Sequence, residues 1–116
     1  MPSFKGTGEI VIQPSDVGVI YSFGFSASTS ATANDGSIPY GTSISSVVVA
    51  AFKETATRTT DTDLVTSSSV TSNVVSVVLK WPTTNGAGLY TLRFFCTLSD
   101  GEKIEYDFGR VIARDL

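Results

Sequence analysis

The chain has 116 residues and a formal net charge of −3 at pH 7, and only 16% of its residues are charged. This length suits a single domain, residues 1–116, with a hydrophobic core that needs no disulfide framework. The acidic balance and the lack of any basic cluster argue against a nucleic-acid partner. No apolar run approaches the length of a membrane span, so we expect no membrane partner either.

Alternation of apolar and polar residues with a period of two, interrupted by Gly, Pro, Asn and Ser, predicts about seven strands and no helix. The valines of the third strand do not keep one clean alternation, which predicts a bulge or burial on both faces there. Pro82 cannot donate to a ladder, so it should end the fifth strand. The predicted strands cover residues 9–13, 17–27, 42–53, 64–66 and 73–81, followed by a hairpin over 88–112.

The register of the C-terminal hairpin can be predicted from its apolar pairs. A two-residue loop at Asp100–Gly101 would set charged side chains opposite the apolar face of the first strand. A three-residue loop, with Gly101 in the left-handed region and a glycine bulge, avoids this conflict. The pairs that it predicts are Cys96 with Ile104, Phe94 with Tyr106, and Leu92 with Phe108.

This pattern predicts an all-β fold, an immunoglobulin-like antiparallel β-sandwich of about seven strands. Gly88 and Tyr90 match the spacing of a tyrosine that, in such sandwiches, bonds back to the turn before its strand. Cys96 is the single cysteine, so no intrachain disulfide can form, and its place on the inward face predicts a small buried side chain.

The sequence carries no recognisable catalytic motif. Histidine is absent, Gly-x-Ser-x-Gly is absent, and the glycines punctuate turns rather than form a phosphate loop. We therefore expect no enzyme activity and no cofactor. Asn34 and Asp35 could ligate calcium together with Asp61 and Asp63 if their loops met. Turn formation in solvated loops explains these residues better, and we predict no metal site.

Several apolar residues are surplus to burial on one face of a strand. They are Val48, Val74, Val78 and Phe95. Either loops and neighbouring sheet edges cover them, or one sheet face is an interface with another subunit or protein. Residues 111–116 would extend the last strand to the end of the chain, where an unprotected edge would invite pairing with another chain.

The order of several segments along the chain resembles that of a known group of proteins. These segments are Tyr21-Ser-Phe-Gly-Phe-Ser26, Ile38-Pro-Tyr-Gly-Thr-Ser-Ile-Ser-Ser46, the Val-rich strand ending at Trp81, Gly88-Leu-Tyr90, and Ser99-Asp-Gly-Glu102. The group is that of small tailed-bacteriophage virion proteins of the fibre–tail adaptor or head–tail accessory type. The resemblance covers most of the chain and brings no catalytic residue with it.

The resemblance implies a non-enzymatic structural protein of a bacteriophage or prophage particle. Such a protein would fold in the host cytoplasm, enter the virion and bind other virion or tail proteins, with a homo-oligomer as a further option. The competing hypothesis is a ligand-binding or adhesion module, for example one that binds carbohydrate, acting through loops 26–41 and 54–63. Its candidate stacking platform is Tyr40, Trp81 and Tyr106.

Overall fold

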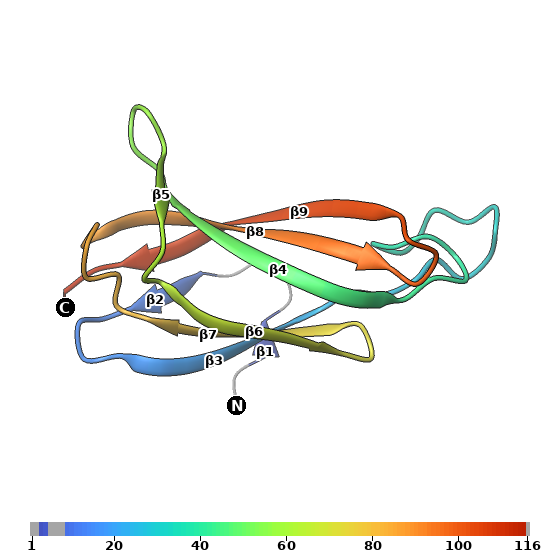
Figure 1. The fold of residues 1–116 in the computed structure, drawn as a ribbon, viewed down its shortest axis with the longest axis horizontal. Helices are drawn as coiled ribbons and strands as arrows, with labels where there is room; N and C mark the ends of the chain where they lie inside the picture. The colour runs from blue at the N-terminus through green and yellow to red at the C-terminus, as the bar shows by residue number, and fades with distance from the viewer. Residues whose placement is uncertain (1–2, 5–8, 116) are drawn as a thin grey trace.

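The computed structural model describes residues 3–4 and 9–115, which fold into two packed β-sheets (Figure 1). The described residues form nine strands and no helix, so the all-β prediction is confirmed, and none of their segments is a helix that could cross a membrane. The strands are β1 (Ser3–Phe4), β2 (Ile10–Ile12), β3 (Val17–Gly24), β4 (Ile44–Lys53), β5 (Thr59–Asp61), β6 (Val65–Thr71), β7 (Val74–Lys80), β8 (Gly88–Leu98) and β9 (Lys103–Ala113).

The strand order is that of an immunoglobulin-like sandwich. One sheet has the order β1–β3–β7–β6, and the other has the order β2–β9–β8–β4–β5. The four-stranded sheet corresponds to one sheet of the immunoglobulin fold, and β9, β8 and β4 correspond to the other. In the five-stranded sheet, β2 and β5 are added at the two edges. Most neighbours are antiparallel, whereas β1 pairs with β3 and β2 pairs with β9 in parallel. The N-terminal region thus contributes an edge strand to each sheet.

The core lies between the two sheets because alternate side chains of the central strands point inward. In β8, the buried apolar side chains are Tyr90, Leu92, Phe94, Cys96 and Leu98, and in β7 they are Val75, Val77 and Leu79. Phe23 of β3 joins the two layers, with ring centroids 4.9 Å from Phe94 and 5.3 Å from Phe108. The predicted burial of Cys96 is confirmed, and this burial raises the pKa of its thiol.

The hairpin of β8 and β9 has the predicted register. Its pairs are Cys96 with Ile104, Phe94 with Tyr106, and Leu92 with Phe108. The Leu98 amide donates to the Glu102 carbonyl at 2.8 Å, and the Gly101 amide donates to the Leu98 carbonyl at 2.9 Å. Gly101 has a φ of 89°, so the three-residue loop with its left-handed glycine is confirmed.

The predicted tyrosine bond at the start of β8 is also present. The Tyr90 hydroxyl donates to the Gly86 carbonyl at 2.6 Å, and the Tyr90 ring is fully buried. This bond ties the turn before β8 to the centre of the sheet. It matches the corner that a tyrosine forms in immunoglobulin-like sandwiches.

We expect Tyr90→Phe to lower the free energy of unfolding by about 1–2 kcal/mol, because the Gly86 carbonyl loses its buried donor. Urea denaturation followed by tryptophan fluorescence measures this change. Tyr40→Phe is the matched control, since the Tyr40 side chain is exposed. Equal effects of the two substitutions would show that the Tyr90 bond contributes no stability of its own.

Two strands differ from the sequence prediction on one side of the molecule. The loop predicted over 54–63 contains β5, and the strand predicted over 64–66 continues to Thr71. β6 pairs with β7 through a two-residue turn at Ser72 and Asn73, whose φ values are 49° and 63°. The serines of β6 lie in an edge strand with one exposed face, where burial does not require apolar residues.

The predicted open edge at the C-terminus is wrong for the described residues. β9 ends at Ala113, and β2 covers its edge by pairing in parallel over residues 111–113. The Arg114 amide then donates to the Ile12 carbonyl at 3.0 Å. Leu116, the last residue of the predicted extension, lies outside the described residues.

Candidate functional site

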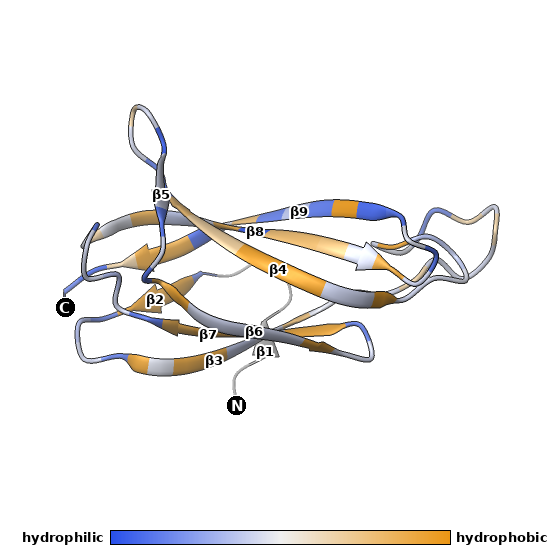
Figure 2. Ribbon diagram, viewed as in Figure 1, coloured by the Kyte–Doolittle hydropathy of each residue, from blue (hydrophilic) through white to orange (hydrophobic). Residues whose placement is uncertain are grey.

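The outer face of the five-stranded sheet carries an apolar strip. Val48 of β4 and Phe95 of β8 are cross-strand partners, and both side chains point away from the core. Val48 is 66% exposed and Phe95 is 38% exposed. Figure 2 shows apolar segments on β4 and β8 and hydrophilic segments on β9, which lies on the other side of β8. A paired, exposed valine and phenylalanine in the middle of a sheet form a small apolar patch on its outer face.

This strip forms the floor of a shallow groove of about 400 Å³, which we call the outer groove. Residues from three neighbouring strands line it: Ser46, Val48, Phe95, Cys96, Thr97, Lys103, Ile104 and Glu105. Lys103 and Glu105 place both signs of charge along its β9 side. The outer groove therefore combines an apolar floor with a mixed-charge rim, which is the anatomy of a protein–protein contact.

Next to the outer groove, two arginines stack on one aromatic ring. The guanidinium carbons of Arg58 and Arg93 lie 5.4 Å and 5.2 Å from the centroid of the Phe52 ring. Arg58 Nη2 is 2.7 Å from Glu54 Oε2, and Arg93 Nε is 2.9 Å from Asp107 Oδ1. Arg93 and Asp107 are cross-strand partners in the hairpin of β8 and β9. These ion pairs orient the two guanidinium groups over the Phe52 ring.

The four predicted interface residues do not share one surface. Val48 and Phe95 lie on the five-stranded sheet, whereas Val74 and Val78 lie on β7 in the four-stranded sheet. Val74 is exposed and Val78 is half-buried, both on the outward positions of β7. A single sheet face cannot hold all four, so the prediction of one interface from this set is wrong, and Val48 with Phe95 remains as its coherent part.

The segment 26–41, predicted as an exposed loop, is folded back on itself. The Ser28 amide donates to the Ile38 carbonyl at 2.9 Å, and the Ile38 amide donates to the Ser26 carbonyl at 3.1 Å. Thr29 donates to the Asp35 carboxylate through its amide at 2.9 Å and its hydroxyl at 2.7 Å. Ser28 and Ile38 are buried, so this segment is a built structure rather than an open loop.

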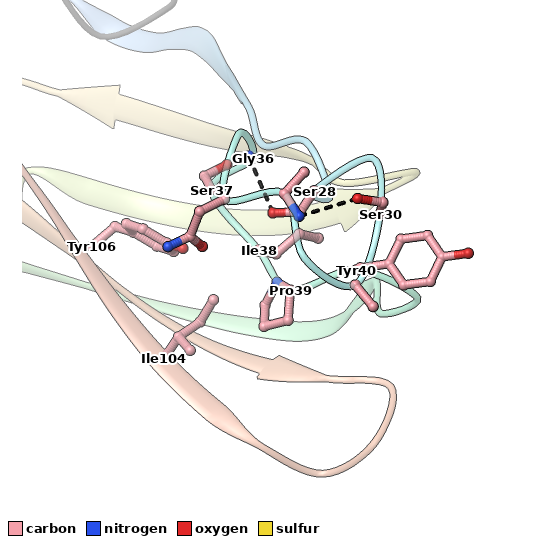
Figure 3. A pocket seen from close by; sticks show the side chains of 12 residues that line it. Ser28, Ser30, Gly36, Ser37, Ile38, Pro39, Tyr40, Ile104 and Tyr106 are labelled. Atoms are coloured by element: carbon pink, nitrogen blue, oxygen red, sulfur yellow. Dashed lines mark hydrogen bonds between the residues drawn. The ribbon is translucent and has the colours of Figure 1, made fainter.

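A second pocket, of about 310 Å³, lies between segment 26–41 and β9 (Figure 3), and we call it the loop pocket. Tyr40 and Tyr106, two members of the predicted platform, both line it. Figure 3 shows their rings on opposite sides of the pocket, with Tyr106 and Ile104 projecting from β9. Ile104 also lines the outer groove, so the two concave regions meet at this residue.

The two predicted binding loops lie at opposite ends of the sandwich. β4 begins at Ile44, next to segment 26–41, and ends at Lys53, next to segment 54–63. Trp81 follows the far end of β7, where its amide donates to the Asp16 carbonyl at 3.1 Å, and it packs against the core. The prediction of a platform that joins Trp81 to Tyr40 and Tyr106 is therefore wrong.

The same separation removes the calcium alternative, because Asn34 and Asp35 lie at one end and Asp61 and Asp63 at the other. Asp61 accepts bonds from the amides of Asp63 and Leu64 at 3.1 and 2.7 Å and from the Asn85 side chain at 2.8 Å. Asp63 accepts from the Thr84 amide at 2.9 Å. In the described part of the chain, no three acidic or cysteine side chains group as metal ligands would.

Hydrogen bonds and ion pairs lower the pKa of four carboxyl groups. The principal donors are Thr29 for Asp35, Arg58 for Glu54, Thr84 for Asp63 and Arg93 for Asp107. At the alkaline end, burial raises the pKa of the Cys96 thiol and raises the pKa of Tyr90 to about 12. The sequence has no histidine, the residue that would titrate between the carboxyl groups at the acidic end and Cys96 and Tyr90 at the alkaline end.

We therefore expect stability to be nearly constant between about pH 5.5 and 8 and to fall on both sides. A lowered carboxyl pKa means that the unfolded state binds protons first, so stability is lost as pH falls below the ordinary pKa values of 3.8 for Asp and 4.5 for Glu. A raised thiol or phenol pKa means that the unfolded state loses protons first, so stability is lost above about pH 9. Thermal melting across pH 2–11 measures this profile, and a maximum confined to a narrow range near pH 6 would contradict it.

The fold and these two concave surfaces define an immunoglobulin-like β-sandwich with an exposed apolar strip on one sheet face. No protein-family model, no curated protein and no solved structure matches the chain. Any functional assignment thus has to come from the surfaces of the chain itself.

Sequence reasoning missed two parts of this surface. Phe52 and Arg58 were not singled out, although an aromatic residue and an arginine flanking a turn are candidates for a cation–π pair. Ile104 packs against the core as predicted, but it is only half-buried and also lines both concave regions, which was not predicted. For Ile104 no sequence signal shows the partial exposure, because the surrounding segments decide how far its side chain is covered.

Proposed function

We propose that this protein is a non-enzymatic structural component of a bacteriophage or prophage particle, of the tail or head–tail accessory type. In this proposal it binds other virion or tail proteins through the outer groove. The exposed cross-strand pair of Val48 and Phe95 is the observation that carries the proposal. The segment order described above, from Tyr21 through Glu102, is what favours a phage particle over other assemblies.

The surroundings of the outer groove support a role in protein contacts. Arginine and aromatic residues dominate the energetics of protein interfaces, and rigid side chains lose little entropy on binding. Arg58 and Arg93 are held on Phe52 by the carboxylates of Glu54 and Asp107. A partner that docks on this face would meet a preorganised surface with an apolar centre.

A surface substitution tests the proposal in the strain that encodes the chain. With the gene deleted, the wild-type protein supplied in trans should restore infectious or transducing particles, whereas the Val48→Glu, Phe95→Glu double variant should restore at least about 100-fold fewer. Two carboxylates in the contact would have to be desolvated without partners, which costs several kcal/mol.

Val17→Glu is the matched control, since Val17 is 87% exposed but belongs to β3 of the other sheet. This control should restore particles as the wild type does. Full restoration by the double variant would contradict a contact through the outer groove. Unchanged particle numbers after deletion of the gene would contradict a structural role in the particle.

A second candidate function is a ligand-binding module that uses the loop pocket. The observation in its favour is a concave region of about 310 Å³ that Tyr106, Ile104 and segment 26–41 enclose. Its lining is rich in serine, which suits a polar ligand such as a carbohydrate. Binding on a glycan array that is lost in Tyr40→Ala, with the fold retained, would favour this function over the assembly role.

A further inference from the structure

The turn between β7 and β8 contains the one Asn-Gly step of the sequence, Asn85–Gly86. An asparagine before a glycine is chemically the most labile kind, because glycine has no side chain to hinder its own nitrogen from attacking the preceding side-chain amide. A Cβ placed on Gly86 would meet no described atom within 4 Å, so the step is sterically open. The turn lies at the same end of the sandwich as β5 (Figure 1).

Deamidation at such a step requires only water. The Gly86 nitrogen gives up its proton and bonds to the side-chain carbonyl carbon of Asn85. The bond from that carbon to Nδ2 breaks, and ammonia leaves with the proton. The succinimide ring that results takes up one water, which opens it at either carbonyl. Nothing is oxidised or reduced, and the product is aspartate or isoaspartate at position 85, with a negative charge where the amide was neutral.

In the folded protein, hydrogen bonds hold both reacting groups. Asn85 Nδ2 donates to Asp61 Oδ1 at 2.8 Å, and the Gly86 amide donates to the Pro82 carbonyl at 2.7 Å. Lys53 Nζ donates to the main-chain carbonyl of Asn85 at 2.5 Å. The side chain that must rotate is thus bound to Asp61, and the proton that must leave Gly86 is bound to Pro82. Both bonds have to open before the reaction can start.

The partners of this step are themselves anchored in the sandwich. Asp61 is only 5% exposed and also accepts from the amides of Asp63 and Leu64. The Gly86 carbonyl accepts from the hydroxyl of Tyr90, whose ring is fully buried. Opening the Asn-Gly step therefore means loosening the corner that joins β5, the start of β6 and β8, which costs more free energy than the opening of a free surface turn.

We propose that Asn85 is a deamidation site which its bond to Asp61 keeps closed while the protein is folded, and that conversion weakens this end of the sandwich irreversibly. In either product, Asp61 loses a hydrogen-bond donor and gains a second carboxylate beside it. Lys53 offsets only part of this repulsion, since its Nζ is bound to the main chain. Isoaspartate also lengthens the main chain by one carbon before Gly86 and displaces the carbonyl that Tyr90 binds.

Peptide mapping by mass spectrometry at mildly alkaline pH measures the rate, because each conversion adds about 1 Da. In urea, Asn85 should react faster than Asn34 and Asn73, which are not followed by glycine. In the folded protein, the rate at Asn85 should be at least about tenfold lower than in urea. Equal rates at Asn85 in the folded and the unfolded chain would overturn the proposal.

Two destabilised variants separate local opening of the corner from global unfolding. Asp61→Ala removes the partner of Asn85, whereas Gly36→Ala forces a Cβ to within 2.4 Å of the backbone at Ala27 and Ser28, at the opposite end. Each is incubated at the same interval below its own Tm, and its rate is divided by that of the same variant in urea. The ratio should rise at least about tenfold in Asp61→Ala and stay near the wild-type value in Gly36→Ala. Equal ratios in the two variants would contradict a role for Asp61.

The consequence of conversion is tested with Asn85→Asp, which carries the charge of the product without the reaction. Its Tm at neutral pH should be at least about 5 °C below that of the wild type. Asn34→Asp is the matched control, since Asn34 is exposed at the other end of the sandwich, and it should change Tm by less than about 2 °C. A wild-type Tm in Asn85→Asp would overturn the proposed weakening.

Discussion

Asp61→Ala should lower the free energy of unfolding by about 3 kcal/mol, which is a large share of the 5–15 kcal/mol typical of a domain. Asp61 is only 5% exposed, and its carboxylate joins three chain segments. It accepts from the amides of Asp63 and Leu64, which begin the path to β6, and from the side chain of Asn85 before β8. Alanine leaves these donors without a partner and loosens this end of the sandwich.

Thermal melting should show this loss as a decrease of about 10 °C in Tm. Asp63→Ala is the matched control, because Asp63 accepts its bonds from Thr83 and Thr84 in an exposed position. The control should cost less than about 1 kcal/mol. If both substitutions lowered Tm equally, burial of the Asp61 bonds would not be the source of the stability.

Gly36→Ala should disrupt segment 26–41 and lower the free energy of unfolding by about 2–3 kcal/mol. A Cβ at this position would lie 2.4 Å from the Ala27 carbonyl carbon and the Ser28 nitrogen, which are backbone atoms that cannot rotate away. The segment would have to separate from its own start, which breaks the bond from the Gly36 amide to the Ser28 hydroxyl. The loop pocket would change shape as a result.

Chemical denaturation and amide exchange across residues 26–41 measure this effect. Gly109→Ala is the matched control, since its added Cβ meets only the Thr91 hydroxyl at 3.4 Å, an ordinary contact. The Gly109 variant should keep wild-type stability within about 1 kcal/mol. Wild-type exchange rates in segment 26–41 of the Gly36 variant would show that the segment can adjust without cost.

Sequence patterns predicted the C-terminal hairpin well because burial alternates strictly from Leu92 to Leu98 on β8. The inward positions from Leu92 to Leu98 on β8 form one apolar row, and only the three-residue loop at Gly101 matches that row to Ile104 and Phe108. Tyr90 was predictable for a similar reason, since its spacing from Gly88 is tied to a specific corner of the sandwich.

The edges of the sheets were harder to predict because polar residues can occupy strands that have one exposed face. The serines of β6 have no alternation in hydropathy, so their strand became apparent only through pairing with β7. For the same reason β5, with two threonines and an aspartate, was not separated from its loop.

The candidate surface was only partly predictable. Alternation identified Val48 and Phe95 as outward residues, but it also selected Val74 and Val78, because a period of two does not say to which sheet a strand belongs. The platform of Tyr40, Trp81 and Tyr106 failed for a related reason. Distances between the ends of strands depend on topology, and the two ends of β4 separate the loops that the sequence analysis had combined.

Quantitative mass spectrometry of particles purified from the strain that encodes the chain tests the central proposal most directly. The proposal predicts that peptides of this protein co-purify with the particles in fixed ratio to the major structural proteins, and that the Val48→Glu, Phe95→Glu variant is absent from them while Val17→Glu is retained. Particles that are complete and infectious but contain none of this protein would contradict it.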